Sequence, residues 1–200
     1  MTIILLGSNN PSGASFLANY KHSPVEVWGR KKPDGLTSSY IYCDLLDPAS
    51  IKHQSLSGVI VSFAPIWLLA SFLATLAKEM PETLHKLTGI IACSSSSFAT
   101  KRFAYNTEDK QLVSKLLTAH SSLQDLAKEL SIPCQILAPT LVYGRVGNYT
   151  DKNISTIIRI LRRTPCIVLP QQTGFRQPIH ATQLALAAMR QTEQIGRAHV

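Results

Sequence analysis

A regular alternation of short apolar runs with longer amphipathic stretches most constrains the fold of this 200-residue chain. The short runs are continuously apolar, which is typical of strands covered by helices on both faces of a sheet. The sequence therefore predicts an α/β protein with a doubly wound parallel sheet, in which ligands bind at the carboxyl ends of the strands. The expected strands are Thr2–Leu6, Val25–Trp28, Tyr40–Cys43, Val59–Phe63, Gly89–Cys93, Cys134–Ala138 and Ile167–Leu169. The expected helices are Ser12–Tyr20, Pro48–Gln54, Ile66–Met80, Thr107–Leu130, Asn153–Arg163 and Ala181–Gln191.

The stretch Gly58–Ala77 is uncharged and long enough to cross a bilayer. Two features favour a buried strand followed by a helix instead. The run at Val59–Val61 is β-branched, and Pro65 falls where a spanning helix would need its backbone hydrogen bonds. We therefore expect no contact with a membrane.

Charge is unevenly distributed along the chain, whose net charge is +8. Residues 1–130 carry 12 basic and 10 acidic side chains, whereas residues 131–200 carry 8 and 2. A local excess of this kind suits a small anionic ligand such as a phosphate better than a nucleic acid.

Four cysteines stand far apart: Cys43, Cys93, Cys134 and Cys166. Their spacing indicates neither a disulfide framework nor a metal site, and a reducing cytoplasm is the expected compartment. The N-terminus lacks the basic region and the cleavage site of a signal peptide.

The turn after the first expected strand, Gly7-Ser8-Asn9-Asn10-Pro11-Ser12-Gly13, has the spacing of a phosphate-binding turn. Such a turn needs a glycine at the bend, a residue that tolerates close backbone approach, and a small residue where helix meets strand. Asn10 holds the central place, and left-handed backbone geometry is expected there. The helix that follows would face a pyrophosphate. A plain strand-to-helix turn is the alternative.

Arg30 and Lys31 follow the second expected strand. A cation at this place suits the 2′-phosphate of NADP, whereas an acidic residue would suit NAD. NADP is the predicted cofactor and NAD the alternative. Asp44, just past the third strand, is the next residue in line to touch the adenine.

Five segments in this order resemble the extended short-chain dehydrogenase/reductases, and more narrowly the NAD-dependent epimerase/dehydratase family: Gly7–Gly13, Asp44–Asp47, Ser94–Ser96, Pro139–Gly144 and Arg176–His180. The resemblance implies a Rossmann-like fold and a nucleotide-linked or otherwise phosphorylated sugar as substrate. It implies cofactor contacts from the glycine turn and from Asp44, Leu45, Ser62, Phe63, Ala64, Ser94, Pro139, Thr140 and Leu141. It implies substrate contacts from Asn153, Arg159 and Arg176.

The catalytic pattern of that family is incomplete here. Its tyrosine lies four residues before a lysine, so that the ammonium stabilises a phenolate on the same helix face. No tyrosine in this chain has that spacing, and Gln111 and Lys115 occupy the two places. Ser96 fits the serine position. Tyr105, Lys101 and His120 are the nearest candidates to replace the tyrosine, although each also fits an ordinary surface residue.

The expected organisation is a dinucleotide-binding domain at residues 1–144 and the start of a small substrate lobe at 145–194. Residues 195–200 resemble a translated sequencing adapter and are expected to be a non-native tail. Two functions remain: an NADP-dependent oxidoreductase or epimerase, and a catalytically silent NADP-binding protein that senses redox state or regulates a partner. A homodimer is left open.

Overall fold

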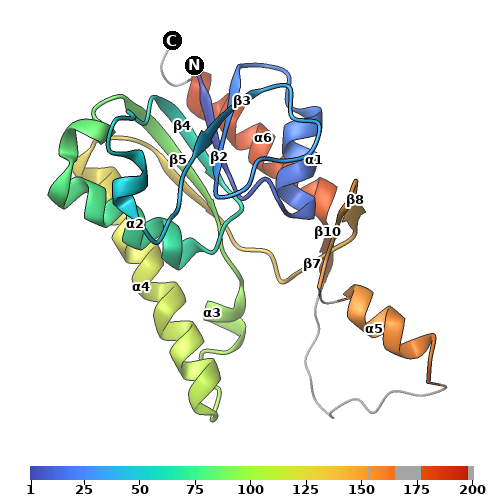
Figure 1. Cartoon of the computed structure of the whole chain (residues 1–200). Helices are drawn as coiled ribbons and strands as arrows, with labels where there is room; N and C mark the ends of the chain where they lie inside the picture. Colours follow the sequence, from blue (N-terminus) through green and yellow to red (C-terminus); the bar gives the residue numbers. More distant parts are fainter. Residues whose placement is uncertain (153, 165–176, 198–200) are drawn as a thin grey trace.

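The centre of the protein is a six-stranded, entirely parallel sheet with the strand order β3-β2-β1-β4-β5-β6 (Figure 1). The computed structural model describes residues 1–152, 154–164 and 177–197. The strands are β1 (Ile3–Leu6), β2 (Val25–Gly29), β3 (Ser39–Tyr42), β4 (Gly58–Ser62), β5 (Leu87–Cys93) and β6 (Cys134–Leu137). The predicted doubly wound parallel sheet is confirmed, and the expected strand Ile167–Leu169 lies outside the described residues.

Helices cover both faces of this sheet. Figure 1 shows α1 (Pro11–Asn19) and α6 (Ala181–Arg197) on one face, and α2 (Ile66–Glu79) and α4 (Thr107–Glu129) on the other. Successive side chains of a strand point to opposite faces. Ile4 and Leu6 therefore pack in the core with α2 and α4, whereas Ile3 and Leu5 pack in the core with α1 and α6. Both cores must be dry, which explains why the sequence of the central strand β1 is continuously apolar.

The uncharged stretch Gly58–Ala77 forms β4 and most of α2, as predicted. Within the described part of the chain, no helix combines the length and apolarity that crossing a membrane requires. The expected helix Pro48–Gln54 is shorter than predicted, because only a 3₁₀ turn, η1 (Pro48–Ile51), forms there under an Asp47 cap. Two further short elements are η2 (Pro81–Leu84) and α3 (Ser97–Thr100).

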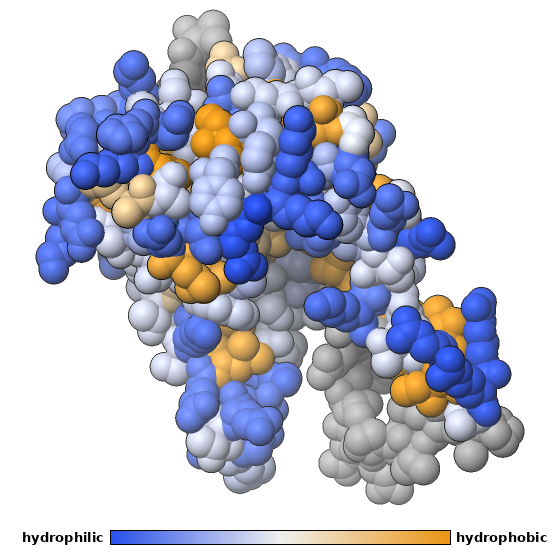
Figure 2. Space-filling model, viewed as in Figure 1, coloured by the Kyte–Doolittle hydropathy of each residue, from blue (hydrophilic) through white to orange (hydrophobic). Residues whose placement is uncertain are grey.

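Small elements follow β6 outside the main sheet. Strand β7 (Leu141–Tyr143) pairs in parallel with β10 (Pro178–His180), and β8 (Arg145–Val146) forms a hairpin with β9 (Tyr149–Thr150). The helix α5 (Ile154–Leu161) projects away from the sheet, and its apolar side chains lie between polar ones on the surface (Figure 2). The division between a cofactor domain and a substrate lobe at residue 144 stays a prediction.

The C-terminal helix α6 extends beyond the predicted end at Gln191 and reaches Arg197. Ile195 is buried in the core beside α1, where its side chain lies next to Gly89 of β5. The origin of residues 195–200 stays a prediction.

Candidate functional site

A cleft runs along the carboxyl edge of the sheet and has two parts. The smaller cavity, of about 250 Å³, lies between the ends of β1, β2 and β3, and the larger, of about 670 Å³, lies toward β5. Asn9, Ala64 and Pro65 line both, so the two cavities meet at the turn after β1. The predicted cofactor residues that line the smaller cavity are Gly7, Ser8, Asn9, Arg30, Lys31, Asp44, Leu45 and Ala64. Those that line the larger are Asn9, Asn10, Pro11, Ser12, Phe63, Ala64, Ser94 and Pro139.

Two glycines allow the turn after β1 to pass close to its neighbours. Gly7 has a φ of +75°, and a Cβ there would lie 2.6 Å from the Ala64 nitrogen. A Cβ on Gly13 would lie 2.2 Å from the Gly7 carbonyl oxygen. Real Cβ atoms do not approach backbone so closely, so both positions require glycine for packing as well as for conformation.

The prediction of left-handed geometry at Asn10 is wrong. Its φ is −139° and its ψ is 166°, which is extended backbone that begins α1 as an N-cap. The side chain explains its presence: Oδ1 accepts from the Gly13 amide at 2.9 Å, and Nδ2 donates to the carbonyls of Gly7 at 2.8 Å and Phe63 at 3.0 Å. Asn10 thus ties the turn to the end of β4.

This cap changes the anion-binding capacity of the α1 N-terminus. Pro11 has no N–H, the Gly13 amide donates to Asn10, and the Ala14 amide donates to the Asn10 carbonyl. In the first turn, the amide of Ser12 remains to meet a phosphate. Helix N-termini bind anions through such amides, so this one offers fewer donors than an uncapped helix start.

The basic turn after β2 lies beside the cap. Asn9 Nδ2 donates to the Lys31 carbonyl at 2.9 Å, which fixes that turn against the end of β1. Trp28 is buried beneath and lines the smaller cavity. Asp44 also lines the smaller cavity, and its Oδ1 accepts a hydrogen bond from the Leu46 amide at 3.0 Å, which orders the loop after β3.

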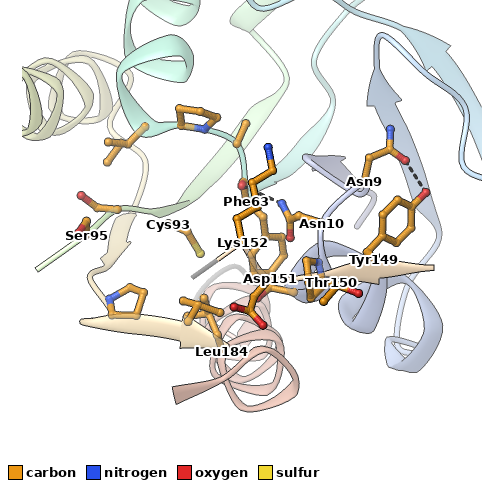
Figure 3. Close-up of a pocket in the computed structure, with 18 of the residues that line it drawn as sticks. Asn9, Asn10, Phe63, Cys93, Ser95, Tyr149, Thr150, Asp151, Lys152 and Leu184 are labelled. Carbon is orange, nitrogen blue, oxygen red and sulfur yellow. Dashed lines mark hydrogen bonds between the residues drawn. The ribbon is translucent and has the colours of Figure 1, made fainter. Parts of the chain in front are cut away.

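The β8–β9 hairpin contributes residues that the sequence did not single out. The Tyr149 hydroxyl donates to Asn9 Oδ1 at 2.8 Å, across 140 positions of sequence, and Figure 3 shows these two side chains facing each other. Lys152 lines the larger cavity and extends toward the loop that carries Phe63 (Figure 3). One sequence feature could have pointed to these residues: a run of polar side chains follows Gly147, in the segment predicted to begin the substrate lobe.

Asp151 also lines the larger cavity and supports this corner of the protein. Burial raises the pKa of its carboxyl, but hydrogen bonds from Ser155 and from the backbone of Gly144 and Ile154 outweigh burial and hold the pKa below its usual value. The charged carboxylate therefore anchors the start of α5 to β7–β8.

The predicted catalytic residues do not gather in the cavity. Ser96 precedes α3 and donates its amide to the Pro139 carbonyl, and Gln111 is exposed on α4. The Lys115 ammonium lies 4.5 Å from the ring centre of Trp67, and this ring lines the larger cavity. Lys115 itself does not line the cavity, and its ammonium contacts the cavity wall through a cation–π interaction with the Trp67 ring.

Among the suggested substitutes for the tyrosine, only His120 approaches the cavity. Tyr105 is 98% exposed, and Lys101 forms an ion pair with Asp109 at 2.5 Å. His120 Nε2 lies 2.6 Å from the hydroxyl of Ser94, which does line the cavity.

The remaining predicted site residues lie in different places. Ser62 is buried at the end of β4, Thr140 donates its hydroxyl to the Gln177 carbonyl, and Leu141 begins β7. Arg159 is exposed on α5. Asn153 and Arg176 lie outside the described residues.

The thiols near the cleft should react slowly. Burial raises the pKa of Cys93, which lines the larger cavity, and of Cys43, which lines the smaller, each to about 12. Since the thiolate is the reactive form, we expect iodoacetamide to alkylate both at least ten times more slowly in the native protein than in urea near pH 7.5. Peptide mass spectrometry would measure each rate, and equal native and unfolded rates at Cys93 would contradict the expectation.

Solved structures of similar fold give this cleft a context. The chain aligns with UDP-glucuronic acid 4-epimerase from Bacillus cereus in complex with NAD (16% identity, TM-score 0.68), over 96% of this chain and 74% of that one. It aligns with dTDP-glucose 4,6-dehydratase from Bacillus anthracis in complex with NAD (16%, 0.62), over 94% and 70%. It aligns with vestitone reductase from alfalfa (16%, 0.63), over 96% and 73%. No protein-family model and no curated protein sequence matches. The chain therefore shares the Rossmann-like α/β fold of these epimerase, dehydratase and reductase structures.

Proposed function

We propose that this protein binds NADP along the cleft, with NAD as the weaker ligand, and acts as an oxidoreductase or epimerase on a nucleotide-linked or phosphorylated sugar. The observation that carries the proposal is the continuity of two cavities across the glycine turn, with a basic end and an apolar end. Two of the similar structures, the epimerase and the dehydratase, contain NAD. Bound cofactor would supply hydride transfer at the apolar end.

The smaller cavity fits the adenosine half of such a cofactor. Gly7 and Gly13 lack the Cβ atoms that would clash with neighbouring backbone, so the turn keeps its shape. A pyrophosphate would rest against this turn, with the Ser12 amide left to donate to it. Asp44 and Leu45 line the wall where adenine would lie, and Arg30 and Lys31 line the wall where a 2′-phosphate would lie. These cations favour NADP over NAD.

The larger cavity fits a nicotinamide together with a phosphorylated substrate. Trp67, Leu116 and Val142 provide apolar walls that exclude water from a reacting carbon. Lys152 adds a cation, and none of the ion pairs between described residues involves it. That ammonium is available to a phosphate.

The silent NADP-binding protein remains a second candidate because of one specific observation. Gln111, at the place of the family tyrosine, is exposed on α4 and does not line the cavity. Binding of NADPH without any hydride transfer would favour this candidate.

The substitution Arg30→Ala tests the cofactor preference. We expect the affinity for NADPH to fall about tenfold, because a charge-assisted hydrogen bond to phosphate is lost, while the affinity for NADH stays unchanged. Titration of the fluorescence of each reduced cofactor would give both values. Lys32→Ala is the matched control, because Lys32 is exposed and does not line the cavity. Equal affinities for NADPH and NADH in the unmodified protein would contradict the proposal.

A further inference from the structure

Ser94 and His120 form a hydrogen-bonded pair at the wall of the larger cavity. Their side chains approach to 2.6 Å although they lie 26 residues apart, one after β5 and one on α4. We propose that this pair is the proton relay of the site: the Ser94 hydroxyl contacts the reacting oxygen of the substrate, and His120 carries the proton behind it. The inference rests on the proposed function, since it assumes a cofactor in the same cavity.

The surrounding contacts hold the pair in place. The Ser94 amide donates to the Leu137 carbonyl at 2.8 Å, which fixes the serine to the end of β6. The Phe98 ring packs edge-on against the imidazole, with centroids 4.8 Å apart. Leu116, one turn before His120 on α4, lines the cavity, whereas His120 does not. The imidazole therefore acts on the cavity through the serine hydroxyl.

The protonation state of the pair suits this role. Burial lowers the pKa of His120, so the imidazole is neutral near pH 7 and can accept a proton from Ser94. The nearby Cys93 cannot replace it, because its thiol, with a pKa of about 12, stays protonated.

The proposed step balances in both directions. When an alcohol is oxidised, with a bound oxidised cofactor as the acceptor of hydride from its carbon, the hydroxyl proton would pass to Ser94 Oγ and the Ser94 proton would pass to His120 Nε2. In reduction, with hydride supplied to the carbonyl carbon by a bound reduced cofactor, Ser94 would donate its proton to the carbonyl oxygen. His120, after taking a proton from solvent, would then reprotonate Ser94. The products are then an alcohol, the oxidised cofactor and a neutral imidazole.

The first experiment uses NADPH and 9,10-phenanthrenequinone, a flat apolar dicarbonyl that suits the walls of the larger cavity. We expect reduction by the unmodified protein, and a fall in kcat of about 100-fold in both Ser94→Ala and His120→Gln, which is typical for loss of general acid–base catalysis. Gln keeps hydrogen bonding but cannot carry the proton, so His120→Gln separates proton transfer from positioning. His85→Gln, at an exposed histidine remote from both cavities, is the matched control.

Two further readouts exclude a merely structural role. We expect added imidazole to restore part of the activity of His120→Ala but none of the activity of Ser94→Ala. In the cofactor-free protein near pH 7.5, the ¹⁵N NMR shift of His120 Nε2 should be that of an unprotonated nitrogen accepting a hydrogen bond, and Ser94→Ala should move it.

The outcomes separate the relay from the proposed function. If NADPH does not bind to the unmodified protein, the proposed function fails and the relay fails with it. If NADPH binds and the quinone is reduced, but Ser94→Ala and His120→Gln retain full kcat, only the relay is overturned. If NADPH binds and the quinone is not reduced, the relay is overturned and the silent NADP-binding candidate is favoured. A protonated Nε2 at pH 7.5 also overturns it.

Discussion

Gly13→Ala is expected to lower the free energy of unfolding by about 3 kcal/mol and to abolish NADPH binding. The added Cβ would lie 2.2 Å from the Gly7 carbonyl oxygen and 2.8 Å from the Ser8 Cα, and both neighbours are backbone. Backbone cannot rotate away as a flexible side chain can, so the turn itself must move. That movement displaces the surface on which a pyrophosphate would rest.

Urea denaturation would measure the stability loss, which corresponds to a fall in Tm of roughly 6–12 °C. Gly196→Ala is the matched control, because a Cβ there meets only the side chain of Met1, at an ordinary distance of 3.4 Å. Alanine is also favoured in a helix, so this control should be neutral or slightly stabilising. A Gly13→Ala protein as stable as the control would show that the turn does not pack as described.

Asn10→Gly is expected to act on stability and on affinity in opposite directions. The free energy of unfolding should fall by about 2 kcal/mol, because two carbonyls lose the donor that Asn10 provides. In the native protein the Gly13 amide donates a hydrogen bond to Asn10 Oδ1. Without that side chain the amide becomes available to a phosphate, so NADPH should bind about fivefold more tightly.

Asn10→Asp is the matched variant. The carboxylate keeps the acceptor for the Gly13 amide but loses both donor hydrogen bonds, and it repels phosphate. We therefore expect it to lower stability and to weaken NADPH binding. Denaturation and titration of all three proteins would measure both quantities. If Asn10→Gly bound NADPH no more tightly than the unmodified protein, the Asn10 cap would not compete with the cofactor.

The parts of the fold that depend on local pattern could be predicted from the sequence. Ile3 and Leu5 face one core and Ile4 and Leu6 the other, so a short run without polar residues is enough to indicate a central strand. The division of the stretch Gly58–Ala77 into a strand and a helix was also predictable from local sequence. Pro65 would break a single helix running through the whole stretch, because it has no backbone N–H to donate.

The parts of the site that depend on side-chain direction could not be predicted. The general backbone preference of asparagine predicted a left-handed conformation at Asn10. Its actual conformation is set by side-chain hydrogen bonds to the carbonyls of Gly7 and Phe63, and Phe63 lies 53 residues away. The hydrogen bond between Tyr149 and Asn9 joins residues that lie 140 positions apart in the sequence. Composition and periodicity carry no information about such pairs.

The positions of the two tryptophans give the protein two separate optical reporters of its own cleft. Trp28 lines the smaller cavity and Trp67 the larger, and the chain contains no other tryptophan. A ligand that occupies only one cavity should therefore quench one indole and leave the other bright, whereas a ligand that spans the turn should dim both. Trp28→Phe and Trp67→Phe would assign each fluorescence signal to one cavity. The order in which the two halves of a dinucleotide bind can then be followed in time without any added dye.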